Sequence, residues 1–208
     1  SHEIRTPLNA IVGFSKLIIE SENREEQDQY AEIVEKNSGL LLNLFNDILD
    51  LSALEAGSLR LSVRSVRLRD VCNLLYHRFC NSVKPGVKLY LDEIDQELCV
   101  QGDWDRISQI WMNLLSNAVK FTSGGEIHYG FEKKEEMVQG YVSDTGIGIP
   151  KKEQKKVFER FYKVNSFTQG SGLGLSLCQI LVQRLQGSLY LDNEYKKGSL
   201  FVFIHPLL

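Results

Sequence analysis

The stretch that decides the fold is DWDRISQIWMNLLSNAVKF, residues 103–121, which predicts a strongly amphipathic helix. Ile107 and Trp111 recur at helical spacing on its apolar face. Directly after it, residues 125–133 and 137–144 alternate apolar and polar side chains, as half-buried strands do. A helix followed at once by such a pair of strands indicates a sheet with helices packed on one face.

Further short runs on both sides of this segment continue the pattern. They predict strands at residues 59–66, 87–94 and 98–103, helices at 69–80 and 173–186, and a final hairpin at 187–206. We therefore expect an α/β sandwich, with one helical layer on a mixed sheet, over residues 58–208.

The first 57 residues differ, because apolar side chains recur there at helical spacing throughout. The pattern predicts two helices separated near residues 21–28, which form a helical hairpin over residues 1–57. The fold class expected for the chain is therefore α+β. In the second helix, eight positions step by alternating fours and threes, and six of them are apolar: Tyr30, Val34, Asn37, Leu41, Leu44, Ile48, Leu51 and Glu55. Such a heptad seam favours a four-helix bundle made by two chains, a homodimer, over packing against the rest of the same chain.

Composition places limits on function. The 208 residues are 43% apolar and carry a formal net charge of −3, which offers no basic surface for nucleic acid. The four cysteines form no CxxC pair, which indicates reduced thiols of a cytoplasmic protein. No apolar run approaches the roughly 20 residues that cross a bilayer. The sequence begins in mid-pattern, so we expect a fragment that would reach an inner membrane only through segments upstream of Ser1.

The polar face of the central helix carries Asn113, Asn117 and Lys120 at positions i, i+4 and i+7. An asparagine carbonyl can bind Mg²⁺ without adding negative charge beside a triphosphate, and a lysine can neutralise phosphate oxygens. The alternative is an ordinary solvated helix face.

Two glycine-rich runs make a nucleotide site the better interpretation. A predicted strand ends in Asp144, whose carboxylate could accept a hydrogen bond from an exocyclic amine such as that of adenine. Gly146 and Gly148 follow and would leave room for the ring. A second run places three glycines ahead of a helix, where free amides suit phosphate: Gly170, Gly172 and Gly174. Neither run fits the Rossmann or P-loop pattern.

The segment between the two runs, KKEQKKVFERFYKVNSFT at residues 151–168, has many charges and few apolar anchors. This composition suggests a mobile lid. We expect Phe158 and Phe161 to anchor it, and Arg160 or Lys163 could reach a phosphate.

A histidine and a glutamate stand side by side at the start of the first helix. On a helical wheel His2 lies opposite Ile4, Leu8, Ile11 and Ile18, so we expect its imidazole to face solvent, near a bend caused by Pro7. Glu3 could hold the imidazole tautomer that leaves Nε2 as the nucleophile. The fourth residue after His2 is Thr6 rather than histidine, which excludes an HExxH zinc protease.

In this combination and order, the motifs resemble those of the sensor histidine kinases of two-component signalling, over essentially the whole chain. Five segments carry the resemblance: SHEIRTPLNAI (1–11) is similar to the H box, NLLSNAVKFT (113–122) to the N box, DTGIGIP (144–150) to the first glycine box, FERFYKV (158–164) to the F box, and GSGLGLSL (170–177) to the second glycine box.

The resemblance implies a dimerisation and phosphotransfer hairpin followed by a GHKL-type ATP-binding domain. It implies that His2 is the phosphoacceptor, Glu3 its acid/base partner and Thr6 the residue that orients water in a phosphatase reaction. Asn117 would bind Mg²⁺, Asn113 and Lys120 would lie near the ATP phosphates, and Asp144 would bind adenine. The phosphoryl group would pass to an aspartate of a response regulator.

Two departures from the family pattern affect these expectations. The family's first helix extends several turns before the histidine, whereas only Ser1 precedes it here, so we expect weak autophosphorylation. Lys163 stands where arginine is common, which leaves the phosphate contacts of the lid open.

Two other functions use the same features. The nucleotide fold also occurs in chaperones, topoisomerases and mismatch-repair ATPases, which would release phosphate without forming a phosphoprotein. A dimeric scaffold that binds a receiver domain and no nucleotide is the non-catalytic alternative.

Overall fold

A computed structural model describes residues 2–165 and 170–207, without the side chain of His2. By their contacts the described residues form two units. The first unit contains the chain up to Leu59 and the described part of Asn165–Leu173, and the second contains Arg60–Val164 and the residues from Gly174 onward. None of the helices in the described ranges is both long and apolar enough to cross a bilayer.

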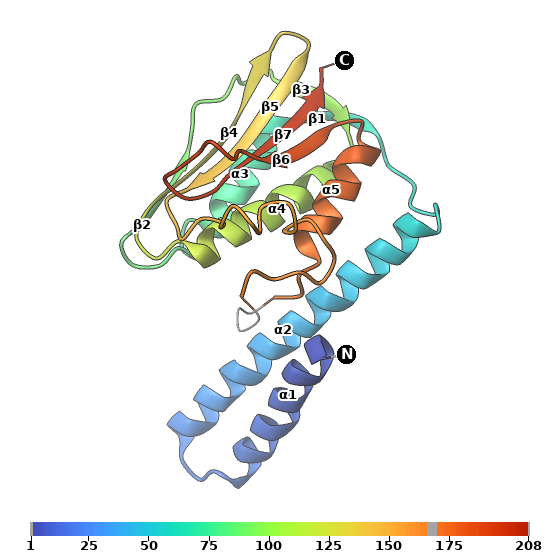
Figure 1. The fold of residues 1–208 in the computed structure, drawn as a ribbon. Helices are drawn as coiled ribbons and strands as arrows, with labels where there is room; N and C mark the ends of the chain where they lie inside the picture. The colour runs from blue at the N-terminus through green and yellow to red at the C-terminus, as the bar shows by residue number, and fades with distance from the viewer. Residues whose placement is uncertain (1, 166–169, 208) are drawn as a thin grey trace. The chain divides into compact units, whose positions relative to one another are not determined.

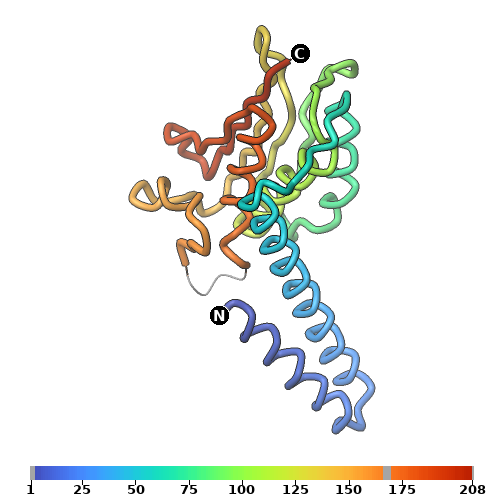
Figure 2. The backbone as a smooth tube through the Cα atoms, turned by 90° about the vertical axis from the view of Figure 1, so that its right-hand side faces the viewer, coloured from blue at the N-terminus to red at the C-terminus, as the bar shows by residue number. Residues whose placement is uncertain are grey.

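The first unit is the predicted helical hairpin. Helices α1 (His2–Glu20) and α2 (Arg24–Glu55) run antiparallel, side by side (Figure 2). Asn23 caps α2, because its Oδ1 accepts a hydrogen bond from the Glu25 amide at 2.9 Å. Across the turn, the Gln27 side-chain amide donates to the Ser21 carbonyl at 2.8 Å. These polar contacts end one helix and begin the next within the predicted interval.

Within one chain the heptad seam of α2 is already partly covered, whereas the sequence led us to expect it at an interface between two chains. All its members except Glu55 are at least partly buried, and Leu44 and Leu51 are buried. Where α1 crosses the start of the seam, the Phe14 and Tyr30 rings pack with their centroids 5.6 Å apart. One residue on the apolar side of α1 is less buried than expected, because Leu8 is 45% exposed.

A second apolar stripe of α2 lies outside this seam. Leu42, Phe45 and Leu49 follow one another at helical spacing and are 63%, 54% and 61% exposed. Because three large apolar side chains in a row remain solvated, the described hairpin leaves part of its apolar surface uncovered.

The second unit contains a mixed five-stranded sheet. Its strands are β2 (Val87–Leu91), β4 (Gly125–Lys134), β5 (Met137–Asp144), β6 (Ser188–Leu191) and β7 (Leu200–Pro206), in the order β2-β4-β5-β7-β6. Strands β2 and β4 are parallel and the other neighbours are antiparallel. The predicted α/β sandwich is confirmed. Two short strands, β1 (Arg64–Arg67) and β3 (Cys99–Gly102), pair with each other in a separate sheet, so the strand expected at 59–66 begins only at Arg64.

Three helices lie on one face of the large sheet (Figure 1). They are α3 (Leu68–Phe79), α4 (Trp104–Phe121) and α5 (Gly174–Arg184). The core centres on Trp111 of α4, whose ring lies 4.4 Å from that of Phe131 and 6.2 Å from that of Phe203. Gly140 makes room for this ring, because a Cβ there would come within 2.5 Å of the indole. The sheet can therefore accept the indole only where the middle strand carries no side chain.

Both ends of α4 are held by side-chain hydrogen bonds. Asp103 caps its first turn, accepting hydrogen bonds through Oδ1 from the amides of Asp105 and Arg106 at 3.0 and 3.1 Å. At the other end, the Lys84 ammonium donates to the Lys120 carbonyl at 3.0 Å, and its positive charge complements the C-terminal end of the helix dipole. These contacts fix the position of the polar face of α4.

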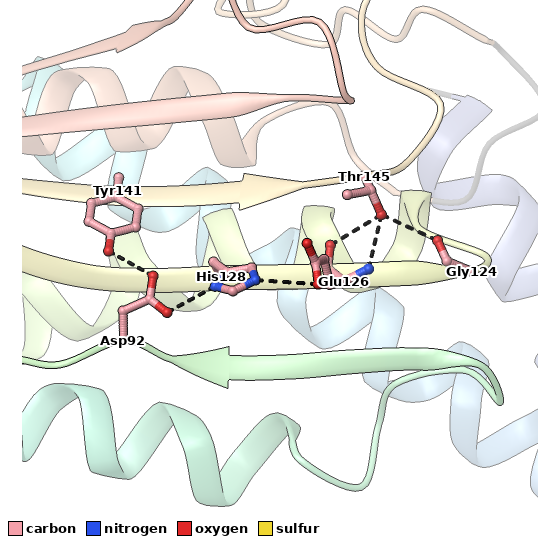
Figure 3. A network of polar contacts seen from close by, with 6 residues as sticks. All are labelled: Asp92, Gly124, Glu126, His128, Tyr141 and Thr145. Carbon is pink, nitrogen blue, oxygen red and sulfur yellow. Dashed lines mark hydrogen bonds and ion pairs between the residues drawn. The ribbon is translucent and has the colours of Figure 1, made fainter.

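The opposite face of the sheet is polar and solvated. Figure 3 shows His128 Nδ1 lying 2.9 Å from Asp92 Oδ1, while the Tyr141 hydroxyl donates to Asp92 Oδ2 at 2.7 Å. The Tyr90 ring stacks on His128 with a centroid separation of 4.7 Å. These contacts join β2, β4 and β5 on the face that the helices leave free.

One histidine lies inside the core. His205 is 2% exposed, and its Nδ1 donates to the Pro206 carbonyl at 2.7 Å. Its Nε2 is buried without a hydrogen-bond partner among the described residues. Burial lowers the pKa of His205 below its usual 6.5, and the bond to Pro206 opposes this shift in part.

This lowered pKa predicts acid sensitivity. Below pH 6.5 the His205 side chain is protonated in the unfolded chain but stays neutral in the folded chain until a lower pH. The free energy of unfolding therefore falls as pH drops, by at most about 1.4 kcal/mol per pH unit for one proton. Urea unfolding at pH 7, 6 and 5 should show a smaller loss of unfolding free energy for His205→Phe than for the parent. The control is His77→Gln, which replaces an exposed histidine and removes no buried group. Equal slopes for all three proteins would contradict the assignment.

Candidate nucleotide site

Asp144 ends β5 at the edge of the core and is only 4% exposed. Its Oδ1 accepts hydrogen bonds from the amides of Gly146 at 2.8 Å and Ser199 at 3.3 Å. Burial raises the pKa of Asp144, and the hydrogen bonds from Gly146 and Ser199 hold it down in part. The carboxyl group is thus held in one orientation in a poorly solvated position.

The backbone around Asp144 leaves no space for other side chains. A Cβ on Gly146 would lie 2.5 Å from the Phe121 carbonyl oxygen and 2.9 Å from Asp144 Oδ1. Gly148 has a φ of +64°, which other residues rarely adopt. The two glycines of the predicted site are therefore required by the backbone itself, besides any space that they leave for a ligand.

Thr145 ties the loop after Asp144 to the start of β4 (Figure 3). Its Oγ1 accepts a hydrogen bond from the Glu126 amide at 2.9 Å and lies 3.4 Å from the Gly124 carbonyl. A Cβ on Gly125 would collide with this hydroxyl group. The contact fixes the direction in which the chain leaves Asp144.

Asn113 is the first of the three predicted polar residues of α4, and its amide nitrogen Nδ2 is buried without a hydrogen-bond partner among the described residues. Gly174, the first residue of α5, packs against it so closely that a Cβ would lie 3.4 Å from Asn113 Oδ1. An unpaired buried donor beside the start of a helix matches an anion that supplies the missing acceptor.

Lys120 lies two turns further along α4, and Asn117 between them is half-buried. Burial lowers the pKa of Lys120, and the nearby positive charge of Lys163 lowers it further. The structure therefore brings together two cations that are far apart in the sequence, beside the polar face of α4. A ligand with several negative charges would relieve this repulsion.

The two aromatic residues that were expected to anchor the lid segment have different surroundings. Phe158 packs edge-on against Phe201 of β7, with centroids 6.2 Å apart, and so anchors the segment as expected. The expectation for Phe161 is wrong, because its side chain is 56% exposed and its backbone has a φ of +61°. A bulky residue held in this conformation indicates that neighbouring contacts, rather than burial of its ring, determine the backbone. Arg160 is exposed.

Gly170 and Gly172 belong to the segment that is grouped with the helical hairpin. Between them, the Ser171 hydroxyl donates to Asp47 Oδ2 on α2 at 3.2 Å. Burial raises the pKa of Asp47, the hydrogen bond from Ser171 lowers it, and the charge of Asp50 raises it. These two glycines therefore share a unit with α2, whereas Gly174 packs on Asn113 in the second unit.

The predicted reactive residues occupy the start of α1. His2 is its first residue, but the His2 side chain lies outside the described part of the structure. Glu3 is half-buried and Thr6 is exposed one turn on. Pro7 is buried within the helix, which continues beyond it to Glu20.

Ser199 and Gly198 contribute to the site but were missing from the sequence prediction. Ser199 orients the Asp144 carboxylate, and a side chain on Gly198 would collide with the Asp144 carbonyl. Their only local signal is the Gly-Ser pair before the last strand, which is an ordinary turn sequence.

Two known families match different parts of the chain. The family described as "His Kinase A (phospho-acceptor) domain" matches residues 1–57. The family described as "Histidine kinase-, DNA gyrase B-, and HSP90-like ATPase" matches residues 102–208.

Among curated proteins, the chain is 34% identical over 220 residues to the autoinducer 2 sensor kinase/phosphatase LuxQ of Vibrio vulnificus. The match covers 100% of this chain and 26% of LuxQ. It is 36% identical over 217 residues to the signal transduction histidine-protein kinase BarA of Escherichia coli, covering 98% of this chain and 23% of BarA. The chain thus spans about a quarter of the length of the curated relatives it matches.

Among solved structures, full-length ShkA in complex with AMPPNP is 29% identical, with a TM-score of 0.70 over 99% of this chain and 44% of that one. Histidine kinase ThkA, solved with the response regulator TrrA, is similar in fold, at 24% identity and a TM-score of 0.77 over 100% of this chain and 59% of that one. Both family matches and the relatives agree with the five motifs. The chain belongs to the sensor histidine kinases of two-component systems.

Proposed function

We propose that this chain is the core of a protein-histidine kinase that transfers a phosphoryl group from ATP to His2. The polar face of α4 carries this proposal, because Asn113 offers an unpaired buried donor and Lys120 lies near a second cation, Lys163. Residues 1–57 would form the phosphoacceptor domain and residues 58–208 the catalytic ATP-binding domain.

The nucleotide would bind with its adenine on Asp144, whose carboxylate accepts from the exocyclic amine. Gly146 and Gly148 would leave room for the ring, and Phe158 and the exposed Phe161 would flank the ligand. The phosphates would be held by amide and ammonium donors: Asn113, Lys120, Lys163, Gly170, Gly172 and Gly174.

The donor set suits a magnesium nucleotide. Asn117 offers a carbonyl oxygen, a ligand type that Mg²⁺ accepts, and no carboxylate is needed beside the phosphates. When bound, Mg²⁺ would neutralise part of the charge on the phosphate oxygens.

In the reaction, Nε2 of His2 would attack the γ-phosphorus while the bond to the ADP oxygen breaks, so that ADP leaves and phosphohistidine forms. Glu3 would accept the imidazole proton and stabilise the neutral nucleophile. Positioning and charge stabilisation would supply most of the catalysis. Thr6 would orient water in a phosphatase reaction on the partner protein.

The partner would be a response regulator, whose receiver aspartate takes the phosphoryl group from His2. The structure of ThkA in complex with the response regulator TrrA supports a partner of this class. The reaction would take place in the cytoplasm, and the full-length protein would be anchored in the inner membrane, as a sensor. We also propose a homodimer, in which the exposed stripe of Leu42, Phe45 and Leu49 is covered by a second copy.

His2→Gln should abolish acid-labile labelling from γ-labelled ATP and leave nucleotide binding intact. Acid-labile label that persists in the variant would contradict the assignment of His2. Release of free phosphate without any phosphoprotein in the parent would instead favour an ATPase.

Asn117→Ala should weaken Mg-ATP binding by about 10- to 100-fold, the range expected for the loss of a contact to a charged group. Isothermal titration with a non-hydrolysable ATP analogue measures the effect. Ser116→Ala, an exposed neighbour on the same helix, should bind as the parent does. A parent with no measurable affinity would support the non-catalytic scaffold.

The double variant Phe45→Glu, Leu49→Glu should sediment as a monomer, because four charges per dimer would have to be buried. A matched double variant with glutamates at two exposed polar positions of α2 away from this stripe, Gln29 and Asn43, should remain dimeric. A parent that sediments as a monomer at all concentrations would contradict the proposed dimer.

A further inference from the structure

Strand β6 forms one edge of the large sheet, with β7 as its only neighbour in the sheet order. The Asp192 amide donates to the Leu200 carbonyl at 2.8 Å, directly after the paired residues Leu191 and Phe201. Since hydrogen-bonded pairs alternate along antiparallel strands, the amides and carbonyls of Leu189 and Leu191 point away from β7, toward the free edge. Such an edge can pair with another strand.

A cavity of about 490 Å³ lies beside this edge. Leu189, Tyr190 and Leu191 of β6 line one side, and Phe158 and Gln154 of the lid segment line another. We call this cavity the β6 groove. Leu189 and Leu191 are buried and Phe158 is half-buried, so the groove has an apolar wall next to backbone groups that can form hydrogen bonds.

Exposed lysines border the β6 groove. Lys151 and Lys155 line it, and an adjoining cavity of about 310 Å³, which shares Lys151, adds Lys196 and Lys197.

The acidic side chains of these two cavities are engaged within the same loop. Asp192 Oδ1 accepts from the Glu194 amide at 2.8 Å, and the Glu194 carboxylate lies 3.9 Å from the Lys196 ammonium. The surroundings are therefore locally basic on a chain whose net charge is −3.

We propose that the β6 groove is a docking site for an extended acidic peptide segment of a partner protein, which adds to β6 as a further strand. Its backbone would pair with the outward groups of Leu189 and Leu191. Alternate side chains would then enter the groove beside Phe158 or face the lysines, because successive side chains of a strand point to opposite sides. The exposed lysines would favour acidic residues at those peptide positions whose side chains face them. The β6 groove shares Phe158 with the proposed nucleotide contacts, and the adjoining cavity includes Gly146 and Gly148, but peptide docking does not depend on kinase activity.

A fluorescein-labelled peptide of alternating glutamate and valine is a suitable probe, measured by fluorescence anisotropy on the whole chain. We expect saturable binding and slower amide hydrogen exchange at Leu189 and Leu191. A peptide with lysine in place of glutamate should bind at least about tenfold more weakly, and so should an N-methylated peptide that cannot pair along the edge. Equal binding of the N-methylated peptide would overturn strand addition.

The double variant Lys151→Glu, Lys155→Glu should weaken peptide binding about tenfold, because it replaces two attractive charges with repulsive ones. Lys88→Glu is the matched control, because Lys88 is exposed on β2 at the opposite edge of the same sheet. Unchanged binding by the double variant, or protection of β2 instead of β6, would refute the site.

Two further measurements separate this site from its alternatives. Asn117→Ala should bind the peptide as the parent does, whether or not the proposed function is correct. Displacement of the peptide by ATP, without slower amide exchange at Leu189 and Leu191, would place the peptide in the nucleotide site and overturn the proposal. Displacement by millimolar inorganic phosphate, without protection at Leu189, would identify a simple anion site and overturn the proposal. Concentration-dependent self-association that blocks the peptide would assign the edge to a second copy.

Discussion

The packing of the second unit depends on the contact between the Trp111 indole and Gly140, a position of β5 that carries no side chain. A Cβ at Gly140 would come within 2.5 Å of the indole and within 2.7 Å of Phe131, so the ring fits the sheet at this glycine. The contact sets the depth and rotation of α4. Since Trp111 and Asn113 are two positions apart on that helix, a firmly buried indole also determines the direction of the polar face.

The candidate site keeps ionisable groups in places where they are costly. Burial raises the pKa of Asp144, while burial and a nearby lysine lower the pKa of Lys120. Both shifts mean that the charged form is less stable than it would be in water. Perturbed groups of this kind gather at functional sites, because a bound ligand supplies the interactions that the folded protein lacks.

The two units also leave two kinds of surface incomplete. On the hairpin it is the stripe of Leu42, Phe45 and Leu49, which needs an apolar cover. On the sheet it is the free edge of β6, whose backbone groups need hydrogen-bond partners as well. Helix packing relies on shape and area, whereas strand pairing relies on backbone direction, so the two surfaces would select different partners.

The sequence by itself determined the hairpin, the helix at residues 103–121, the positions of most strands along the chain and the polar stripe of Asn113, Asn117 and Lys120, because each depends on periodicity within a few turns or on adjacent residues. Only the tertiary structure decided that Ser199 orients Asp144, that Lys163 lies near Lys120 and that Phe161 stays exposed. Those features depend on contacts between segments far apart in the chain. Local patterns carry no information about such contacts, since packing and backbone pairing determine them when the whole unit folds.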